Sequence, residues 1–91
     1  MNQLNDCQVI SVRPLENSGK LKAFVDIRIG GAIIIEHCAI YDGKNGRFAS
    51  LPQRVTADGK WRKVVFVADD DLKKHYEETI LKAYAEEVKE N

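Results

Sequence analysis

The sequence predicts an α+β domain: a small, twisted antiparallel β-sheet of four to five strands with a C-terminal α-helix packed on it. Three observations predict this class. Residues 20–29 alternate apolar and polar side chains, which is typical of a strand with one buried face. Residues 41–62 contain three Asp-Gly or Asn-Gly dipeptides, so the chain reverses there more than once. Residues 72–88 carry apolar side chains at helical spacing.

The N-terminal third predicts two strands. Residues 1–6 are polar and are expected to fray. Residues 7–12 form a short β-prone run, and Pro14 ends it or places it on a sheet edge, because proline has no N–H to donate. A turn follows, and residues 20–29 form the second strand. One face of that strand carries Leu21, Ala23, Val25, Ile27 and Ile29.

Gly30 and Gly31 predict a two-residue hairpin turn into the next strand. In that register Val25 faces Glu36, which places a carboxylate on the core face. Glu36 must then lie at the sheet rim, or a bulge must shift it. The other face of the hairpin would be apolar, and a second subunit is expected to cover it. The residues of this predicted dimer interface are Phe24, Ile33, Ile35 and Tyr41.

The C-terminal half predicts two more strands and a helix. Residues 47–51 form a short strand, and residues 60–68 form another whose near-continuous apolar sequence suggests burial on both faces. Residues 69–71 are three aspartates that can cap a helix start, and the helix is expected over residues 70–87. Its apolar stripe consists of Leu72, Tyr76, Ile80, Ala83 or Tyr84, and Val88.

The length of 91 residues predicts one domain, residues 1–91, with a thin core. The net charge of zero conceals an asymmetry, because residues 1–68 carry +4 and residues 69–91 carry −4. Two cysteines are too few for a disulfide framework. No signal peptide or membrane-spanning run is recognised, so a cytoplasmic protein with reduced thiols and no membrane partner is expected.

Few residues could carry catalysis. His37, Cys38 and Cys7 match no zinc-binding spacing, and the expected roles are a surface histidine and a core cysteine. His75 is expected to be solvated among helix charges. The aspartates of residues 69–71 could bind a cation, although a helix start explains them more simply. We therefore expect no enzyme activity, no catalytic residue, no metal, no cofactor and no small-molecule substrate.

A basic cluster is the remaining candidate site. Residues 44–63 carry six basic side chains and one acidic side chain, and basic side chains neutralise phosphates and release counterions. Phe48 and Trp61 lie among them and could stack on unpaired bases. Alternatively, both aromatic residues belong to the core and the charges keep the turns soluble. The candidate nucleic-acid contacts are Lys44, Arg47, Arg54, Lys60, Arg62 and Lys63.

The same segment resembles the stage V sporulation protein G family, SpoVG, also called septation proteins. The resemblance extends from about residue 9 to residue 84 and is densest where the chain reads Asp42-Gly43-x-Asn45-Gly46-x-Phe48-Ala49-x-Leu51-Pro52-x-Arg54-x-Thr56-x-Asp58-Gly59-x-Trp61-Arg62. It implies a small bacterial regulator with an antiparallel sheet and a C-terminal helix. It further implies a homodimer that binds DNA, in some members RNA, and that is linked to septation, sporulation and gene expression.

The family places basic residues directly after a Met/Leu-Pro dipeptide. Arg54 matches the first of these positions, whereas Val55 departs from the second, and Arg62 matches a recurrent arginine. The strand over residues 33–41 departs as well, which indicates a divergent member. Two hypotheses follow. The first is a dimeric nucleic-acid-binding regulator, and the second is a protein-interaction module in cell division or regulation with little nucleic-acid binding.

Overall fold

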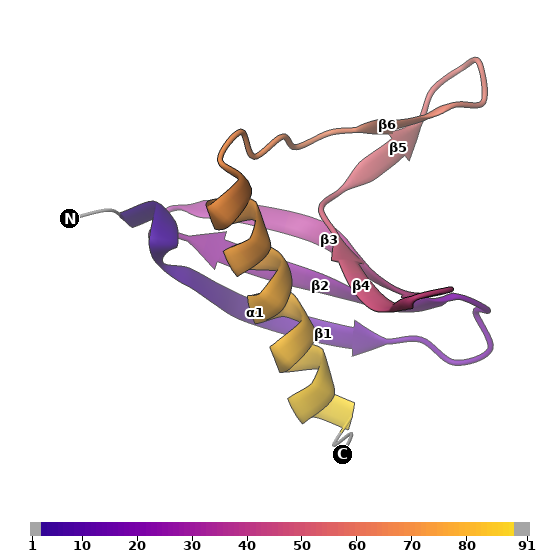
Figure 1. Cartoon of the computed structure of the whole chain (residues 1–91), viewed down its shortest axis with the longest axis horizontal. Coiled ribbons are helices and arrows are strands. Elements are labelled where there is room, and N and C mark those ends of the chain that lie inside the picture. The colour runs from indigo at the N-terminus through magenta and orange to yellow at the C-terminus, as the bar shows by residue number, and fades with distance from the viewer. Residues whose placement is uncertain (1–2, 89–91) are drawn as a thin grey trace.

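The computed structural model describes residues 3–88 and contains a four-stranded antiparallel sheet, a two-stranded hairpin and one long helix (Figure 1). The sheet strands follow chain order: β1 (Cys7–Pro14), β2 (Leu21–Ile29), β3 (Ile33–Gly43) and β4 (Gly46–Ser50). The helix α1 (Asp70–Val88) lies across one face of the sheet. We call the opposite face, which carries Phe24, Ala39 and Tyr41, the open face. The predicted α+β fold is confirmed.

The core lies between the sheet and α1. Every second side chain of β2 is buried, from Ala23 to Ile29, as the alternation predicted. The buried side chains of α1 are Tyr76, Ile80 and Tyr84, which confirms most of the predicted stripe. Burying an aliphatic side chain of this size stabilises a fold by about 1.5–3 kcal/mol. The core also contains Cys38, Ile40, Ala49 and Leu51.

The β2–β3 hairpin differs from the prediction in its turn. Three residues, 30–32, form the loop, and the Ala32 N–H donates a hydrogen bond to the Ile29 carbonyl (3.1 Å). Both glycines adopt a positive φ, which residues with a side chain rarely do. Ile29 therefore pairs with Ile33 and not with Ala32.

A bulge in β3 removes the conflict at Glu36. Ile27 pairs with Ile35 and Val25 pairs with Cys38, so Glu36 and His37 together stand opposite Asp26. His37 has a φ of 65°, a left-handed conformation that the bulge accommodates. Glu36 is exposed as a result, and Cys38 enters the core. The bulge was one of the two explanations that the sequence allowed.

The bulge also separates the four residues predicted to form a dimer interface. Phe24 and Tyr41 lie on the open face. Ile33 and Ile35 lie on the helix side, because Ile33 pairs directly with buried Ile29 and Ile35 packs against the core. The prediction of one common face was therefore wrong, since each residue inserted into a strand reverses the alternation that follows it.

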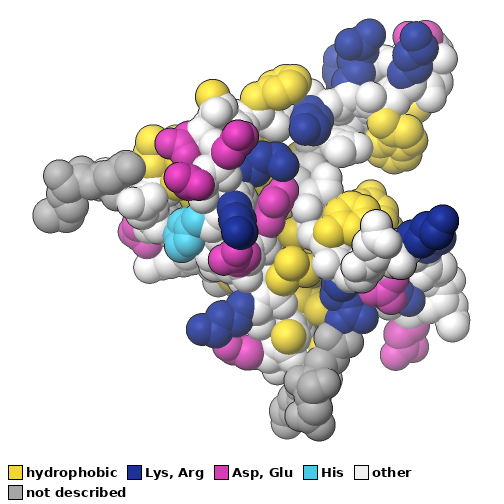
Figure 2. All heavy atoms as spheres, viewed as in Figure 1, with side chains coloured by type: hydrophobic (Ala, Val, Ile, Leu, Met, Phe, Trp, Pro, Cys, Tyr) yellow, Lys and Arg dark blue, Asp and Glu magenta, His cyan; other side chains and the backbone are white. Residues whose placement is uncertain are grey.

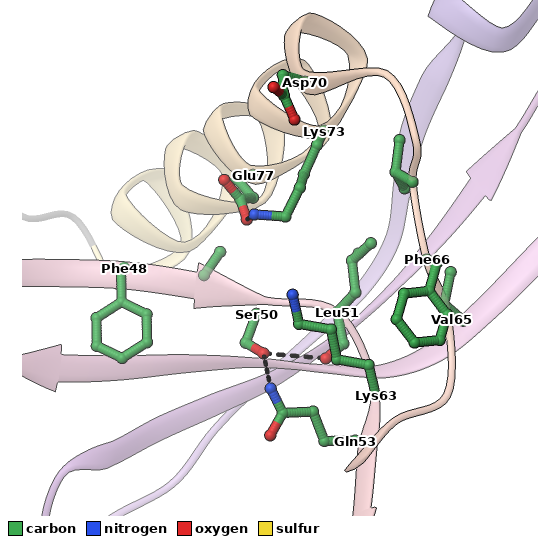
Figure 3. A pocket seen from close by; sticks show the side chains of 12 residues that line it. Phe48, Ser50, Leu51, Gln53, Lys63, Val65, Phe66, Asp70, Lys73 and Glu77 are labelled. Carbon is green, nitrogen blue, oxygen red and sulfur yellow. Dashed lines mark hydrogen bonds and ion pairs between the residues drawn. The ribbon is translucent and has the colours of Figure 1, made fainter.

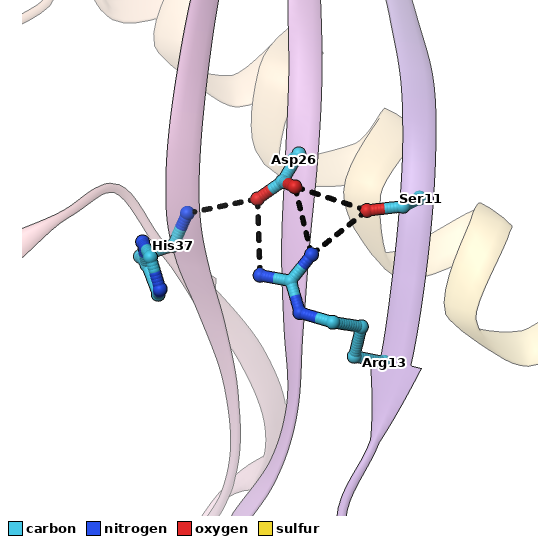
Figure 4. Close-up of polar contacts among 4 residues, drawn as sticks. All are labelled: Ser11, Arg13, Asp26 and His37. Carbon is cyan, nitrogen blue, oxygen red and sulfur yellow. Dashed lines mark hydrogen bonds and ion pairs between the residues drawn. The ribbon is translucent and has the colours of Figure 1, made fainter.

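Asp26 links the three strands at this level (Figure 4). Its carboxylate accepts two hydrogen bonds from the Arg13 guanidinium (2.7 and 3.1 Å), one from the Ser11 hydroxyl (3.0 Å) and one from the His37 backbone N–H (3.1 Å). A second irregularity, between Val9 and Ser11 of β1, lies at the same level. One carboxylate on β2 thus holds a bulge on each neighbouring strand. Hydrogen bonding to Arg13 lowers the pKa of Asp26 to about 2.

The chain leaves the sheet after β4. Strands β5 (Gln53–Val55) and β6 (Trp61–Lys63) pair with each other and project beyond the sheet (Figure 1); we call residues 53–63 the arm. The prediction of a doubly buried strand over residues 60–68 was wrong. Val64 and Phe66 are 55% and 77% exposed, whereas the alternate residues of this run pack against the core. The run is an extended connection from the arm to α1, with one side buried.

The start of α1 is capped, and the N-terminal segment of the described chain is anchored on this helix. Asp69 caps the helix by accepting a hydrogen bond from the Leu72 N–H (3.0 Å), which confirms the predicted helix start. Residues 3–5 form a short 3-10 helix and are not frayed, because the Tyr76 hydroxyl donates to the Leu4 carbonyl (2.7 Å). A His75 ring nitrogen lies 2.8 Å from the Asn5 carbonyl. The first two residues of the predicted frayed segment lie outside the described residues.

Candidate nucleic-acid interface

Backbone hydrogen bonds hold the arm at its base and at its tip. At the base, the Val64 N–H donates to the Pro52 carbonyl (3.0 Å). At the tip, the Thr56 N–H donates to the Lys60 carbonyl and the Gly59 N–H to the Thr56 carbonyl, each at 2.9 Å. Gly59 has a φ of 79°, which suits glycine in a tight turn. The arm is therefore an ordered hairpin in the free protein.

Asp58, the acidic residue of the arm, stabilises the turn at this tip. Its carboxylate accepts a hydrogen bond from the Thr56 hydroxyl and another from the Lys60 N–H (3.2 Å). These bonds lower the pKa of Asp58, the Thr56 hydroxyl having the largest effect. The carboxylate is thus ionised at neutral pH and is engaged in the turn.

The two faces of the arm differ in character. Arg54 pairs directly with Arg62, so both guanidinium groups extend from the same face. Val55 pairs with Trp61 and Gln53 with Lys63 on the opposite face. All of these side chains are exposed, and Figure 2 shows Lys and Arg side chains gathered on the arm. We call the Arg54–Arg62 side the basic face and the Val55–Trp61 side the apolar face.

The basic face has no neutralising partner within residues 3–88. The described ion pairs join Arg13, Lys22, Arg47, Lys73 and Lys74 to carboxylates, and none involves Arg54 or Arg62. Like charges directly opposite each other in a ladder are destabilising. An anion bound between these guanidinium groups would relieve that repulsion.

The structure divides the six predicted contact residues between two hairpins. Lys60 at the tip and Lys63 at the base join the arginine pair on the arm. Lys44 lies exposed in the β3–β4 turn. Arg47, in β4, donates to the Asp42 carboxylate (2.8 Å), and its guanidinium lies 4.9 Å from the centre of the Tyr84 ring. Arg47 therefore has a structural role between the sheet and α1.

The two aromatic residues of this segment are not core residues, so that interpretation was wrong. Phe48 is 48% exposed and stacks on Tyr41, with ring centres 5.5 Å apart. Trp61 is 66% exposed on the apolar face of the arm. A cavity of about 310 Å³ lies between Trp61 and open-face residues that include Phe24 and Tyr41. The aromatic surface and the basic face therefore point in different directions.

Sequence reasoning missed a groove where the arm, β4 and α1 meet (Figure 3). Its volume is about 450 Å³. Phe66 forms one apolar side, and α1 contributes the ion pair between Lys73 and Glu77 (3.1 Å). Gln53 donates to the Ser50 hydroxyl (3.2 Å) at its floor. The sequence holds no signal for this groove, because residues 64–67 are all apolar and only the structure shows that Val64 and Phe66 are exposed.

The two cysteine thiols and His37 are candidate reactive groups of the sequence. Cys38 is fully buried, and burial raises its pKa to about 12; burial also raises the pKa of Cys7. Both thiols are thus protonated at neutral pH and weakly reactive. His37 is exposed and contacts Phe24 edge to face, so the predicted core cysteine and surface histidine are confirmed. Among the described residues, no three His, Cys, Asp or Glu side chains are grouped to hold a metal ion.

Within the described part of the chain, α1 is too polar to cross a membrane, and no other helix is long enough.

Fold and site together define a small α+β domain that presents an ordered basic hairpin. The SpoVG family model matches residues 6–86, and the chain belongs to this family. It is similar to the proteins named "Putative septation protein SpoVG" from Staphylococcus aureus (strains JH9 and NCTC 8325 / PS 47) and Staphylococcus haemolyticus (strain JCSC1435). Each is 26% identical over 77 residues, which cover 85% of this chain and 77% of the relative. The prediction that this chain is a divergent member of the family is confirmed.

Proposed function

We propose that this chain is a small homodimeric regulator that binds DNA, with RNA as the alternative, through the arm, and that it acts in septation or sporulation. Family membership and the name of its staphylococcal relatives support the septation role. The Arg54–Arg62 pair carries the nucleic-acid proposal: two exposed arginines are direct cross-strand neighbours on a projecting hairpin and have no carboxylate partner in residues 3–88. The proposal assigns binding and no catalysis.

Local charge supports an anionic partner although the whole chain is neutral. The arm carries four cationic side chains, and the carboxylate of Asp58 is engaged in the tip. A ligand responds to the charge within about one Debye length, roughly 10 Å at 0.1 M salt. Arginine suits phosphate because its planar fork can donate two parallel hydrogen bonds. The acidic residues of α1 do not pair with the basic face.

The salt dependence of binding tests this proposal. If the four arm cations neutralise about four phosphates, log K should fall with log salt at a slope of about −3 to −4. We would measure the anisotropy of a fluorescent DNA duplex and a matched single strand at several salt concentrations. Arg54→Ala/Arg62→Ala should reduce the slope to about −2, because two of the four cations that lie near the nucleic acid are removed.

A matched control removes two charges elsewhere. Lys74→Ala/Lys82→Ala deletes two exposed cations of α1 and should leave the affinity and the slope close to those of the wild type. Circular dichroism would establish that both double variants are folded. No salt-sensitive binding by the wild type, or equal losses in the two double variants, would overturn the assignment to the arm.

A homodimer is supported by the apolar surface that the isolated chain exposes. Trp61 is 66% exposed, and the apolar face of the arm stands near Phe24 and Tyr41 on the open face. Large contiguous apolar patches on a small protein mark interaction sites. We assign this surface to a second copy of the chain, which leaves the basic faces of both arms available for nucleic acid.

Sedimentation velocity tests the dimer. Trp61→Ser should shift the wild-type dimer toward a monomer, because it removes a large side chain from the proposed contact. Ile10→Ser is the control, since Ile10 is 46% exposed on β1 at the other edge of the sheet. A wild-type protein that remains monomeric at its highest soluble concentration would contradict the dimer.

The groove beside Phe66 favours a second candidate, a protein-interaction module in cell division or regulation. Apolar and charged walls of the kind drawn in Figure 3 suit a protein segment. Under this alternative, Phe66→Ser abolishes function in cells while nucleic-acid affinity and the dimer persist. Loss of cellular function in Arg54→Ala/Arg62→Ala alone would instead support nucleic-acid binding.

A further inference from the structure

We propose that the arm enters the major groove of duplex DNA with its basic face toward the base edges. This inference rests on the proposed nucleic-acid function and names the form of nucleic acid and the way it is contacted. It follows from three properties of the arm: its shape, its order in the free protein, and the separation of its basic face from its aromatic residue.

The shape of the arm matches a groove. The arm is a two-stranded antiparallel ribbon that projects beyond the sheet (Figure 1). Its two strands lie about 4.8 Å apart, and about five residues separate Pro52 from the tip, a reach of roughly 16 Å at 3.3 Å per residue. The major groove of B-DNA is about 12 Å wide and 8.5 Å deep and admits a two-stranded ribbon. The major groove of A-form RNA is too narrow for one.

The ribbon is ordered before binding. The Val64–Pro52 hydrogen bond closes its base, and the Thr56 and Gly59 bonds close its tip. The Asp58 carboxylate adds two more bonds to the same turn. A preformed element loses little conformational entropy when it binds, which favours insertion as a rigid body.

The faces of the ribbon decide between a duplex and a single strand. Arg54 and Arg62 are direct cross-strand neighbours, so their guanidinium groups can reach adjacent positions on a groove floor. Arginine bonds the O6 and N7 atoms of guanine with two hydrogen bonds. Trp61 pairs with Val55 on the opposite face. A single strand stacked on Trp61 would therefore lie away from the arginine pair, whereas the floor of a duplex groove can meet the arginine pair and leave the Trp61 face to the protein.

Competition and substrate preference test the inference. We would compare a 20-base-pair DNA duplex with the matched single-stranded DNA and the matched RNA duplex, all at one salt concentration. The duplex DNA should bind at least about tenfold more tightly than either. Methyl green, which occupies the major groove, should displace the protein, and distamycin, which occupies the minor groove, should not.

A conservative variant supplies a second measurement. Arg54→Lys/Arg62→Lys keeps both charges but removes the planar fork. It should keep the wild-type salt slope, and it should lose the several-fold preference of the wild type for a guanine-containing duplex over the same duplex with 7-deazaguanine, which lacks N7. Equal or tighter binding to single-stranded DNA or to the RNA duplex would overturn the groove assignment and leave the proposed function standing. Binding to no nucleic acid would overturn both.

Discussion

Asp26→Asn should destabilise the fold by about 1–2 kcal/mol at pH 7, because this carboxylate holds the bulges of β1 and β3. Lowering its pKa from 3.8 to about 2 corresponds to about 2.4 kcal/mol, at about 1.36 kcal/mol per pKa unit. The Arg13 side chain is 43% exposed, so solvent screens the pair and roughly half of that stabilisation remains. The hydrogen bonds from Ser11 and from the His37 N–H contribute to the same lowering of the pKa and are already included.

The direction of the pKa shift determines how the stabilisation by Asp26 changes with pH. The pKa is lower in the folded chain than in the unfolded chain, so the stabilisation is complete above about pH 4 and is lost as the pH falls to about 2. Urea unfolding followed by far-ultraviolet circular dichroism at pH 7 and pH 2 would measure the free energies. The difference between wild type and Asp26→Asn should be largest at pH 7 and should shrink strongly at pH 2.

Glu78→Gln is the matched control for that experiment. Glu78 is exposed and lies 4.0 Å from Lys74, so its replacement should cost at most about 0.5 kcal/mol. An Asp26→Asn variant as stable as the wild type at pH 7 would refute the reasoning. So would a loss of stability that is the same at both pH values.

Three further predictions concern the core, the arm and the sheet–helix contact. Ile80→Ala should cost about 2–5 kcal/mol in urea unfolding, because Ile80 is fully buried between α1 and the sheet; a loss below about 1 kcal/mol would contradict that packing. Gly59→Ala places a side chain at a φ of 79°, so nucleic-acid affinity should fall while global unfolding changes by at most about 1 kcal/mol; unchanged affinity would show that the tip is unimportant. Arg47→Met should lower the melting temperature and leave the salt slope of binding unchanged, because the Arg47 guanidinium is engaged with Asp42 and Tyr84. A flatter slope would show that Arg47 contacts the nucleic acid.

Much of the candidate site was predictable because turn chemistry and charge are local properties. The Asp58-Gly59 dipeptide predicted a reversal of the chain, and the six basic residues of 44–63 were apparent without coordinates. The direct Arg54–Arg62 pairing was not predictable, since a shift of one residue would have moved either arginine to the other face. The engagement of Arg47 also depended on Tyr84, which is distant in the sequence.

The sequence by itself determined the α+β class, the alternation of β2 and the helix with its Asp69 cap, because these follow from local periodicity and backbone capping. Only the tertiary structure decided the β3 bulge, which three strands stabilise through Asp26, and with it the faces of Ile33 and Ile35. It also decided that residues 64–67 belong to no strand and connect the arm to α1. An apolar run predicts that a segment will be at least partly buried. Which residues bury it depends on the path of the whole chain.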